Sequence, residues 1–397
     1  MIQTTASRTV NSPNDTAGRP TICHVIHALG VGGAEVLVDQ MMRRMNDRYR
    51  CVVAVLDEVG EIGQRLQADG FVVQHLHRQP GIDRGCARRL DAFARRENAR
   101  LLHAHQYTPF FQAMMSRGLT GNRPVLFTEH GRHFPDLPSR KRMMANRMLL
   151  RKCDRLVGCG KAVRNALVNN EGLPADRVKV VYNGADLDAL NQPSPDARRR
   201  IRAEFGIADD CFVAVQVARL HELKDHGTAL RAIHEVRKSV PGIRLLIAGD
   251  GDRRGMIEAM ITDLQLEDHV ILAGARGDVA DLLAASDAFL MSSISEGIPL
   301  TIIEAMAARI PVVATAVGGI PEMIDDNCSG LLAPSGDDRS LAKCLQRLHA
   351  DPALRKSMTE HAELTARSTF SLSGMLSSYS SLYSEMLAGT GVGKTGN

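Results

Sequence analysis

The feature that most constrains the fold is a regular alternation of short apolar runs with helix-length amphipathic segments. Runs such as Thr21–Ala28 and residues 51–56 are short and rich in β-branched side chains, as buried parallel strands are. The segments between them, such as 34–44 and 84–98, carry apolar residues at helical spacing. This alternation predicts an α/β fold with a doubly wound parallel sheet.

The alternation is interrupted once and then begins again. Residues 191–196 (NQPSPD) contain two prolines and several turn formers, which predict a linker. A second series follows, opening with a strand at 212–217. We therefore predict two Rossmann-like domains, at residues 21–190 and 197–371, that face a central cleft where a ligand binds.

The ends of the chain are predicted to lie outside these domains. Residues 1–20 are polar and lack the apolar stretch of a signal peptide, so we expect a flexible segment. Residues 372–387 are expected to form a helix that packs back on the first domain, and 388–397 a disordered tail. The tail sequence GVGKT at 391–395 resembles the end of a P-loop, but no strand precedes it and only two residues follow it.

Composition excludes several functional classes. The formal net charge of +4 is too balanced for a dedicated nucleic-acid-binding protein, and 4% aromatic residues are too few for extended base stacking. The eight cysteines are scattered and form no CxxC pair. Several lie inside apolar runs, and this pattern favours buried free thiols in a reducing compartment over a disulfide framework or a zinc site. No apolar run has the length of a transmembrane helix.

A glycine-rich turn follows the first predicted strand. Its sequence, GVGGAE at residues 30–35, opens a helix whose N–H groups suit a phosphate. A dinucleotide-binding fingerprint requires glycine at position 35, where this chain has Glu35. An NAD site is therefore disfavoured, and a tight turn without a ligand remains an alternative.

Two further strand ends carry charged residues. Arg219 and Lys224 follow the strand at 212–217, and two cations at a strand end suit a phosphate. The segment 295–304 (SEGIPLTIIE) joins a strand to a helix and contains Glu296 and Glu304. A carboxylate beside a helix N-terminus is often only a cap, which is the alternative for Glu296.

These motifs occur in the order and spacing seen in family-4 retaining glycosyltransferases of the GT-B fold, which the chain resembles over about residues 21–387. The resemblance rests on GVGGAE, the Arg219/Lys224 pair, the two glutamates, VYNGAD at 181–186 and GDG at 249–251. The stretch 281–324 is especially similar to that family. One motif alone is weak, whereas five in order are specific.

The resemblance implies donor-side roles for the second domain. Arg219 and Lys224 would neutralise the donor diphosphate, and Glu304 would hold the ribose hydroxyls. Glu296 would contact the donor sugar. The backbone beside it would cradle sugar or phosphate through Gly297, Ile298, Pro299 and Leu300.

The resemblance also implies roles for other loops. Gly32 and Gly33 would approach the donor phosphates, and Arg276, in the loop 274–278, would face the nucleobase. His130, in the sequence TEHG, matches a histidine near the donor sugar on the acceptor side. With Glu296, Arg219 and Lys224 it completes the predicted catalytic set. His105 is predicted to line the acceptor pocket.

Fixed cations and helix N-termini can stabilise a leaving diphosphate without a metal. The sequence has no convincing Asp-x-Asp beside a strand end and no obvious covalent nucleophile. We therefore expect metal-independent transfer without a cofactor. The resemblance implies retention of configuration, with front-face attack.

Residues 139–155 form a strongly basic segment with seven basic residues and one acidic residue. Met144, Met148 and Leu149 fall near one helical face, so the segment reads as a membrane-surface element. The alternative is a solvated helix whose Met/Leu face packs on the first domain. The cations predicted to meet an anionic membrane are Arg140, Lys141, Arg142, Arg147, Arg151 and Lys152.

The predicted function is transfer of a hexose from a nucleotide-diphosphate sugar to a saccharide or glycolipid acceptor. UDP-sugars are favoured as donors, and GDP-mannose remains open. We expect the chain to act in the cytoplasm, at the inner membrane face, in synthesis of a surface or exported polysaccharide. The alternatives are a sugar-nucleotide epimerase of the same fold, a non-catalytic nucleotide-sugar-binding protein and an NAD-linked oxidoreductase.

Overall fold

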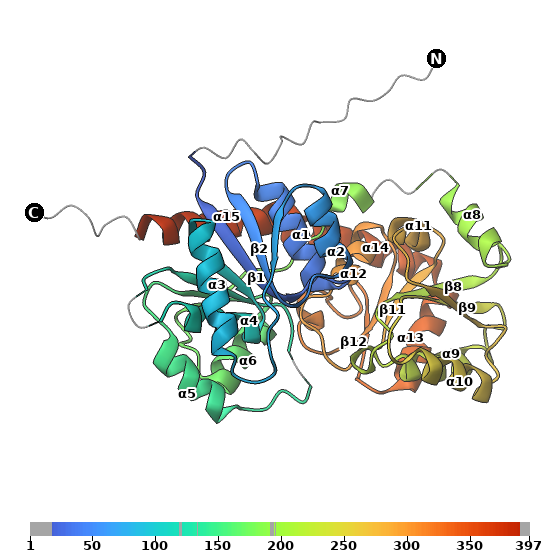
Figure 1. Ribbon diagram of the computed structural model, residues 1–397. Coiled ribbons are helices and arrows are strands. Elements are labelled where there is room, and N and C mark those ends of the chain that lie inside the picture. The colour runs from blue at the N-terminus through green and yellow to red at the C-terminus, as the bar shows by residue number, and fades with distance from the viewer. Residues whose placement is uncertain (1–17, 119–120, 133, 191–193, 195, 390–397) are drawn as a thin grey trace, which may run out of the picture. The chain divides into compact units, whose positions relative to one another are not determined.

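The chain folds around two parallel β-sheets, as the alternation predicts (Figure 1). The structure, a computed structural model, describes residues 18–118, 121–132, 134–190, 194 and 196–389. The flexible N-terminal segment, most of the linker and the tail therefore lie largely outside the described residues, and these expectations remain predictions.

The first sheet has seven strands in the order β3-β2-β1-β4-β5-β6-β7. The side chains of residues 51–56 on β2 are all buried, which explains why the run is apolar on both faces. The strands are β1 (Thr21–Ala28), β2 (Arg50–Glu58), β3 (Val72–His75), β4 (Ala99–His105), β5 (Val125–Glu129), β6 (Arg155–Gly158) and β7 (Val178–Val180).

The second sheet has six strands in the order β10-β9-β8-β11-β12-β13. Its core is built from aliphatic side chains of the strands and of α9 and α13. The strands are β8 (Phe212–Val217), β9 (Ile243–Ala248), β10 (Val270–Gly274), β11 (Ala288–Met291), β12 (Val312–Thr315) and β13 (Leu331–Ala333). The order reverses between β8 and β11, so this sheet has the switch point at which doubly wound folds bind ligands.

Helices connect successive strands in both sheets (Figure 1). Those of the first half are α1 (Gly33–Met45), α2 (Gly60–Ala68), α3 (Arg84–Arg96), α4 (Tyr107–Ser116), α5 (Arg140–Leu149), α6 (Lys161–Glu171) and α7 (Leu187–Leu190). Those of the second half are α8 (Ala197–Glu204), η1 (Glu222–Lys224), α9 (His226–Val236), α10 (Arg254–Asp263), α11 (Val279–Ala284), α12 (Leu300–Ala307), η2 (Ile320–Glu322), α13 (Asp338–Ala350), α14 (Pro352–Thr369) and α15 (Leu372–Gly389).

By its contacts the chain divides into two compact units. Unit 1 comprises the residues up to Thr128, Leu149–Arg155 and the residues from Ser380 on. Unit 2 comprises Glu129–Met148 and Leu156–Tyr379. The predicted domain limits at 190 and 197 remain predictions.

The sequence pattern predicts a strand at residues 125–130 and a helix at residues 140–153, and both end earlier than predicted. The strand β5 ends at Glu129, so His130 begins a loop instead of closing a strand. The helix α5 ends at Leu149, because the Arg117 guanidinium takes the Leu149 carbonyl and Asp154 accepts the Arg151 N–H. The prediction that this helix continues to residue 153 was therefore wrong.

The predicted buried thiols are confirmed in part. All eight cysteines are free, and five are buried. Cys153, Cys328 and Cys344 are only partly buried.

Candidate functional site

Neighbouring strands of the second sheet bring an ammonium group and a carboxylate together. Lys224 follows β8, and Glu296 follows β11, which lies beside β8. Lys224 Nζ donates to Glu296 Oε1 at 2.5 Å, and Ser293 Oγ donates to the same oxygen at 2.6 Å. The Glu296 side chain is only 8% exposed and that of Lys224 22%. The pair is therefore a partly desolvated charge centre, where electrostatic interactions are stronger than in water.

Hydrogen bonds from the surrounding backbone fix this centre. Ser292 Oγ donates to the Lys224 carbonyl at 2.9 Å, and the Ile294 N–H donates to the Leu223 carbonyl at 2.9 Å. The loops after β8 and β11 are thus tied to each other at two points. Lys224 is held in place by the fold, whereas Arg219, earlier in the same loop, is exposed.

The GDG motif supports the Arg219 loop by close packing. A Cβ on Gly249 would lie 1.9 Å from the Ala218 carbonyl oxygen, so only glycine fits there. The Leu220 N–H donates to the Asp250 carbonyl at 3.0 Å. This motif therefore positions the loop that carries the cations.

Gly297 allows two loops to meet beside Glu296. A Cβ at this position would lie 2.2 Å from the His130 carbonyl oxygen and 2.9 Å from Cys159 Sγ. His130 and Gly297, distant in sequence, are therefore neighbours, as two members of the predicted site should be.

The N-terminus of α12 follows directly. The helix begins at Leu300, as the predicted helix at residues 300–307 does, and its N-cap residue is Pro299, with no side-chain cap hydrogen bond. Backbone N–H groups that lack a side-chain cap suit an anion. Glu304 lies on this helix, half-buried, and desolvation raises its pKa to about 7. Such a carboxyl group can both donate to and accept from a hydroxyl.

His130 is held as a neutral imidazole. Its Nδ1 lies 3.4 Å from Asn183 Oδ1, and Asn183 Nδ2 donates to the Ile298 carbonyl at 3.0 Å. Burial lowers the pKa of His130 to about 4, against the opposing effect of the Asn183 hydrogen bond. At neutral pH the ring can therefore serve as a hydrogen-bond donor or acceptor without charge. Asn183 lies in the VYNGAD motif, but the motif alone predicts no role for this residue.

Glu322 is a second residue without a predicted role. Its carboxylate accepts the Lys161 and Ala162 N–H groups of α6, each at 2.7 Å, and the Tyr182 hydroxyl at 3.0 Å. Desolvation, helped by this hydrogen bond to Glu322, raises the pKa of Tyr182 to about 12. Glu322 therefore caps α6 and ties η2 to Tyr182, the neighbour of Asn183 in the chain.

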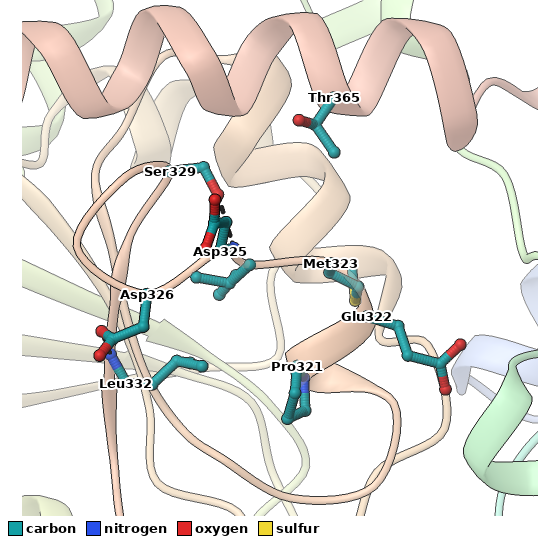
Figure 2. A pocket seen from close by; sticks show the side chains of 9 residues that line it. Pro321, Glu322, Met323, Asp325, Asp326, Ser329, Leu332 and Thr365 are labelled. Atoms are coloured by element: carbon teal, nitrogen blue, oxygen red, sulfur yellow. Dashed lines mark hydrogen bonds between the residues drawn. The ribbon is translucent and has the colours of Figure 1, made fainter.

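A hollow of about 510 Å³ is lined by the end of η2, the residues that follow it and Thr365 of α14 (Figure 2). In Figure 2 the Glu322 carboxylate points away from Asp325 and Asp326, which line the same hollow. None of the predicted site residues lines it. An acidic rim does not suit a diphosphate, so this hollow is not the candidate site.

Arg276 does not join the cluster around Glu296. Its guanidinium pairs with Asp278 at 2.7 and 2.8 Å and with Glu204 of α8 at 2.5 Å. These hydrogen bonds raise its pKa. To contact a nucleobase, the Arg276 guanidinium would have to share the N–H groups that it donates to Asp278 and Glu204. The predicted contact with the nucleobase therefore remains a prediction.

Gly32, Gly33 and His105 lie in unit 1. Gly32 is the N-cap of α1 in an extended conformation, and a Cβ on Gly33 would meet nothing within 4 Å. A Cβ on Gly32, however, would lie 2.3 Å from a carboxylate oxygen of Glu35, so an acidic side chain lies beside this N-terminus, and the approach of Gly32 and Gly33 to a phosphate remains a prediction. His105, by contrast, is fully buried, so its position does not support a role in lining an acceptor pocket.

His105 belongs to a buried trio of imidazoles. The nitrogen atoms of His24, His103 and His105 lie within 4.8 Å of one another among the described residues. His24 Nδ1 is 3.0 Å from His105 Nε2, and His103 bonds Tyr383 Oη at 2.7 Å and Thr128 Oγ1 at 2.9 Å. Hydrogen bonds to protein groups thus engage four of the ring nitrogens, and the trio fits a polar core network better than a metal site.

This trio predicts acid sensitivity. Desolvation lowers the pKa of His24 to about 3, whereas an unfolded histidine titrates near 6.5. Between these values the unfolded chain binds the additional proton, so stability falls as the pH drops below about 6.5. At pH 5.5 the loss is about 1.4 kcal/mol for this one residue.

Urea unfolding at pH 7.5 and 5.5 measures this loss. His24→Gln should reduce the difference between the two pH values, whereas the exposed His361→Gln should leave it unchanged. An equal pH dependence in wild type and His24→Gln would contradict the role of His24.

Comparisons with known proteins agree with this architecture. Residues 197–365 match the family model of glycosyl transferases group 1, and residues 31–189 match that of glycosyltransferase family 4. A relative from Bacillus anthracis, N-acetyl-alpha-D-glucosaminyl L-malate synthase, is 28% identical over 78% of this chain and 80% of that protein. The amylovoran biosynthesis glycosyltransferase of Erwinia amylovora is 32% identical over 63% of this chain and 56% of that protein.

Solved structures share the fold at low sequence identity. Anabaena Alr3699/HepE, solved in complex with UDP, superposes with a TM-score of 0.81 at 22% identity, covering 92% of this chain and 100% of that one. A glycosyltransferase from Rickettsia africae also reaches 0.81, at 19% identity, covering 93% and 99%. The order of the motifs, the two parallel sheets and the family matches agree: the chain is a family-4 glycosyltransferase of the GT-B fold.

Proposed function

We propose that this glycosyltransferase moves a hexose from a UDP-sugar to a saccharide or lipid-linked saccharide, with retention and without a metal ion. The observation that carries the proposal is the Lys224–Glu296 pair beside the uncapped N-terminus of α12. A leaving diphosphate develops negative charge, and a fixed ammonium group beside open N–H groups stabilises that charge. The UDP and UDP-glucose complexes of Anabaena Alr3699/HepE support this donor class. GDP-mannose is the second candidate donor.

The mechanism assigns one task to each residue. Lys224 and the exposed Arg219 neutralise the diphosphate, and the N–H groups at the start of α12 bind a phosphate or sugar oxygen. Glu304 hydrogen-bonds the ribose hydroxyls. Glu296 already accepts hydrogen bonds from Lys224 and Ser293, so it contacts the sugar as an acceptor rather than as a nucleophile.

The acceptor hydroxyl attacks the anomeric carbon from the same face that the diphosphate leaves, and the anomeric configuration of the donor is therefore retained. The neutral His130 positions a sugar hydroxyl near the acceptor. The acceptor that we propose belongs to a surface or exported polysaccharide assembled at the cytoplasmic face of the membrane, and a relative named for amylovoran biosynthesis supports a biosynthetic role.

Turnover with a donor panel tests the proposal. The chain is incubated with UDP-glucose, UDP-N-acetylglucosamine or GDP-mannose in excess EDTA, with water or an added saccharide as the acceptor of the sugar, and released nucleoside diphosphate is measured. NMR gives the anomer of the first sugar product. We expect release from one donor, undiminished by EDTA, with the anomeric configuration of that donor.

The alternatives give different results. An epimerase converts the sugar without any dependence on an acceptor, and a binding protein releases no nucleoside diphosphate. Loss of turnover in EDTA contradicts the metal-free site. An inverted anomer, or a glycosyl adduct on Glu296, contradicts front-face retention.

A further inference from the structure

Four large apolar side chains are exposed within one short segment of unit 2. Phe134 is 58% exposed, Leu137 69%, Met144 64% and Met148 76%. They account for half of the eight large hydrophobic residues exposed in the described part of the chain. The alternative expectation, that the methionines of this helix pack on the protein, is therefore wrong for Met144 and Met148.

Exposed cations share this surface. Arg140, Lys141 and Arg147 are exposed on α5. Arg140, Met144 and Met148 follow each other at intervals of four residues, so cation and methionines lie on one outward face. The outward face of α5 is thus both basic and apolar.

The opposite face of α5 is bound to the protein. Asn146 is buried, and its Nδ2 donates to the Glu171 carbonyl at 2.9 Å. Arg142 donates to the Glu171 carboxylate at 2.8 Å. Arg142 is therefore a structural residue and leaves the group of predicted membrane cations.

The loop before α5 is also anchored. Arg132 holds the carboxylate of Asp136 through two hydrogen bonds, at 2.8 and 2.9 Å, which neutralises the one acidic residue between 134 and 148. Asn170 Nδ2 donates to the Asp136 carbonyl at 3.1 Å, and the Ser139 N–H donates to the Asn170 carbonyl at 2.8 Å. These hydrogen bonds attach the loop to the protein, while the side chains of Phe134 and Leu137 remain exposed.

We propose that Phe134, Leu137, Met144 and Met148, with Arg140, Lys141 and Arg147, form a docking surface for an anionic phospholipid bilayer. The apolar side chains enter the boundary between headgroups and acyl chains, and the cations bind lipid phosphates. Charge complementarity selects this partner, because a basic rim repels a second copy of itself. No helix in the described residues is long and apolar enough to cross a bilayer.

Docking here has a consequence for the site. His130 opens the loop that carries Phe134, and the Ser295 hydroxyl donates to the Arg132 carbonyl at 3.4 Å in that loop. A membrane bound at Phe134 therefore lies close to the acceptor side of the proposed site. The docking surface itself does not depend on the proposed function.

Vesicle flotation tests the proposal without any measurement of activity. The purified chain is mixed with vesicles of pure phosphatidylcholine, or of phosphatidylcholine with about a third phosphatidylglycerol, at low and high salt. We expect binding to the anionic vesicles and little to the neutral ones. Arg140→Gln/Lys141→Gln/Arg147→Gln should weaken binding about 100-fold. Met144→Ser/Met148→Ser should weaken it at least about tenfold at every salt concentration.

Matched variants control for charge and apolar area elsewhere. Three other exposed arginines give Arg65→Gln/Arg88→Gln/Arg100→Gln, and two other exposed apolar residues give Met256→Ser/Leu364→Ser. Both should bind anionic vesicles as the wild type does. Absence of binding by the intact chain, or equal losses in test and control variants, would overturn the proposal. Self-association abolished by Met144→Ser/Met148→Ser, without vesicle binding, would also overturn it and assign the surface to a second copy.

Discussion

Lys224→Ala should lower the rate of sugar transfer about 100-fold to 1000-fold, the usual effect of removing one group that stabilises developing negative charge. Lys224 is the ammonium group that the fold holds against Glu296, and nearby backbone hydrogen bonds keep its loop in place. Without it, the leaving diphosphate loses a fixed cation, and the nearly buried Glu296 carboxylate loses its charged partner.

Steady-state kinetics and nucleotide affinity separate these effects. If Lys224 binds the diphosphate, Lys224→Ala weakens nucleoside diphosphate binding as well as turnover. If it only holds Glu296, turnover falls while nucleotide affinity stays unchanged. Lys238, an exposed lysine paired with Glu235, provides the control Lys238→Ala, which should behave as wild type. Undiminished turnover in Lys224→Ala would contradict the assigned site.

Asp154→Ala should destabilise unit 1 by about 3–5 kcal/mol, the range for removing one partner of a buried ion pair. The Asp154 and Arg117 side chains are 0% exposed, and two hydrogen bonds join them at 2.6 and 3.1 Å. Asp154 also accepts the Val125 and Arg151 N–H groups. The substitution therefore leaves a buried guanidinium and two backbone donors without their acceptor.

Urea unfolding measures this destabilisation. Glu258→Ala, which breaks the exposed pair with Arg254, should leave the unfolding midpoint unchanged, because such surface pairs contribute little. If Asp154→Ala does not fold, the double variant Arg117→Met/Asp154→Leu should fold, since it removes both charges together. A wild-type midpoint for Asp154→Ala would contradict the account.

The fold was predictable from the sequence because its elements depend on local patterns. The strands Thr21–Ala28 and Phe212–Val217 and the helix Leu300–Ala307 have the predicted bounds. The predictions were wrong where an element ends at a contact with residues that are distant in the sequence. The helix α5 stops at Leu149 because Arg117, far away in sequence, binds its last carbonyl.

The site was predictable only in part. Lys224 and Glu296 could be placed at neighbouring strand ends, but their direct pairing depends on how far each side chain reaches. The partner of Arg276, Glu204, comes from a helix that no local pattern connects to it. His105 and His103 are two residues apart on one strand, so their side chains lie on the same face of the sheet. His24 is the register partner of His103 on the neighbouring strand, and all three side chains are buried. Asn183 and Glu322 required the folded chain, since Asn183 bonds His130 and Ile298, 53 and 115 residues away, and Glu322 bonds Ala162, 160 residues away.

The measurement that tests the central claim most directly is a comparison of wild type with Lys224→Ala in the donor assay. Wild type and Lys224→Ala are incubated with UDP-glucose, UDP-N-acetylglucosamine or GDP-mannose in excess EDTA, and nucleoside diphosphate release is followed. We expect wild-type release from one donor that EDTA does not diminish and that nearly disappears in Lys224→Ala. Release that requires a divalent metal, or that persists in the variant, would contradict a metal-free glycosyltransferase site built on Lys224.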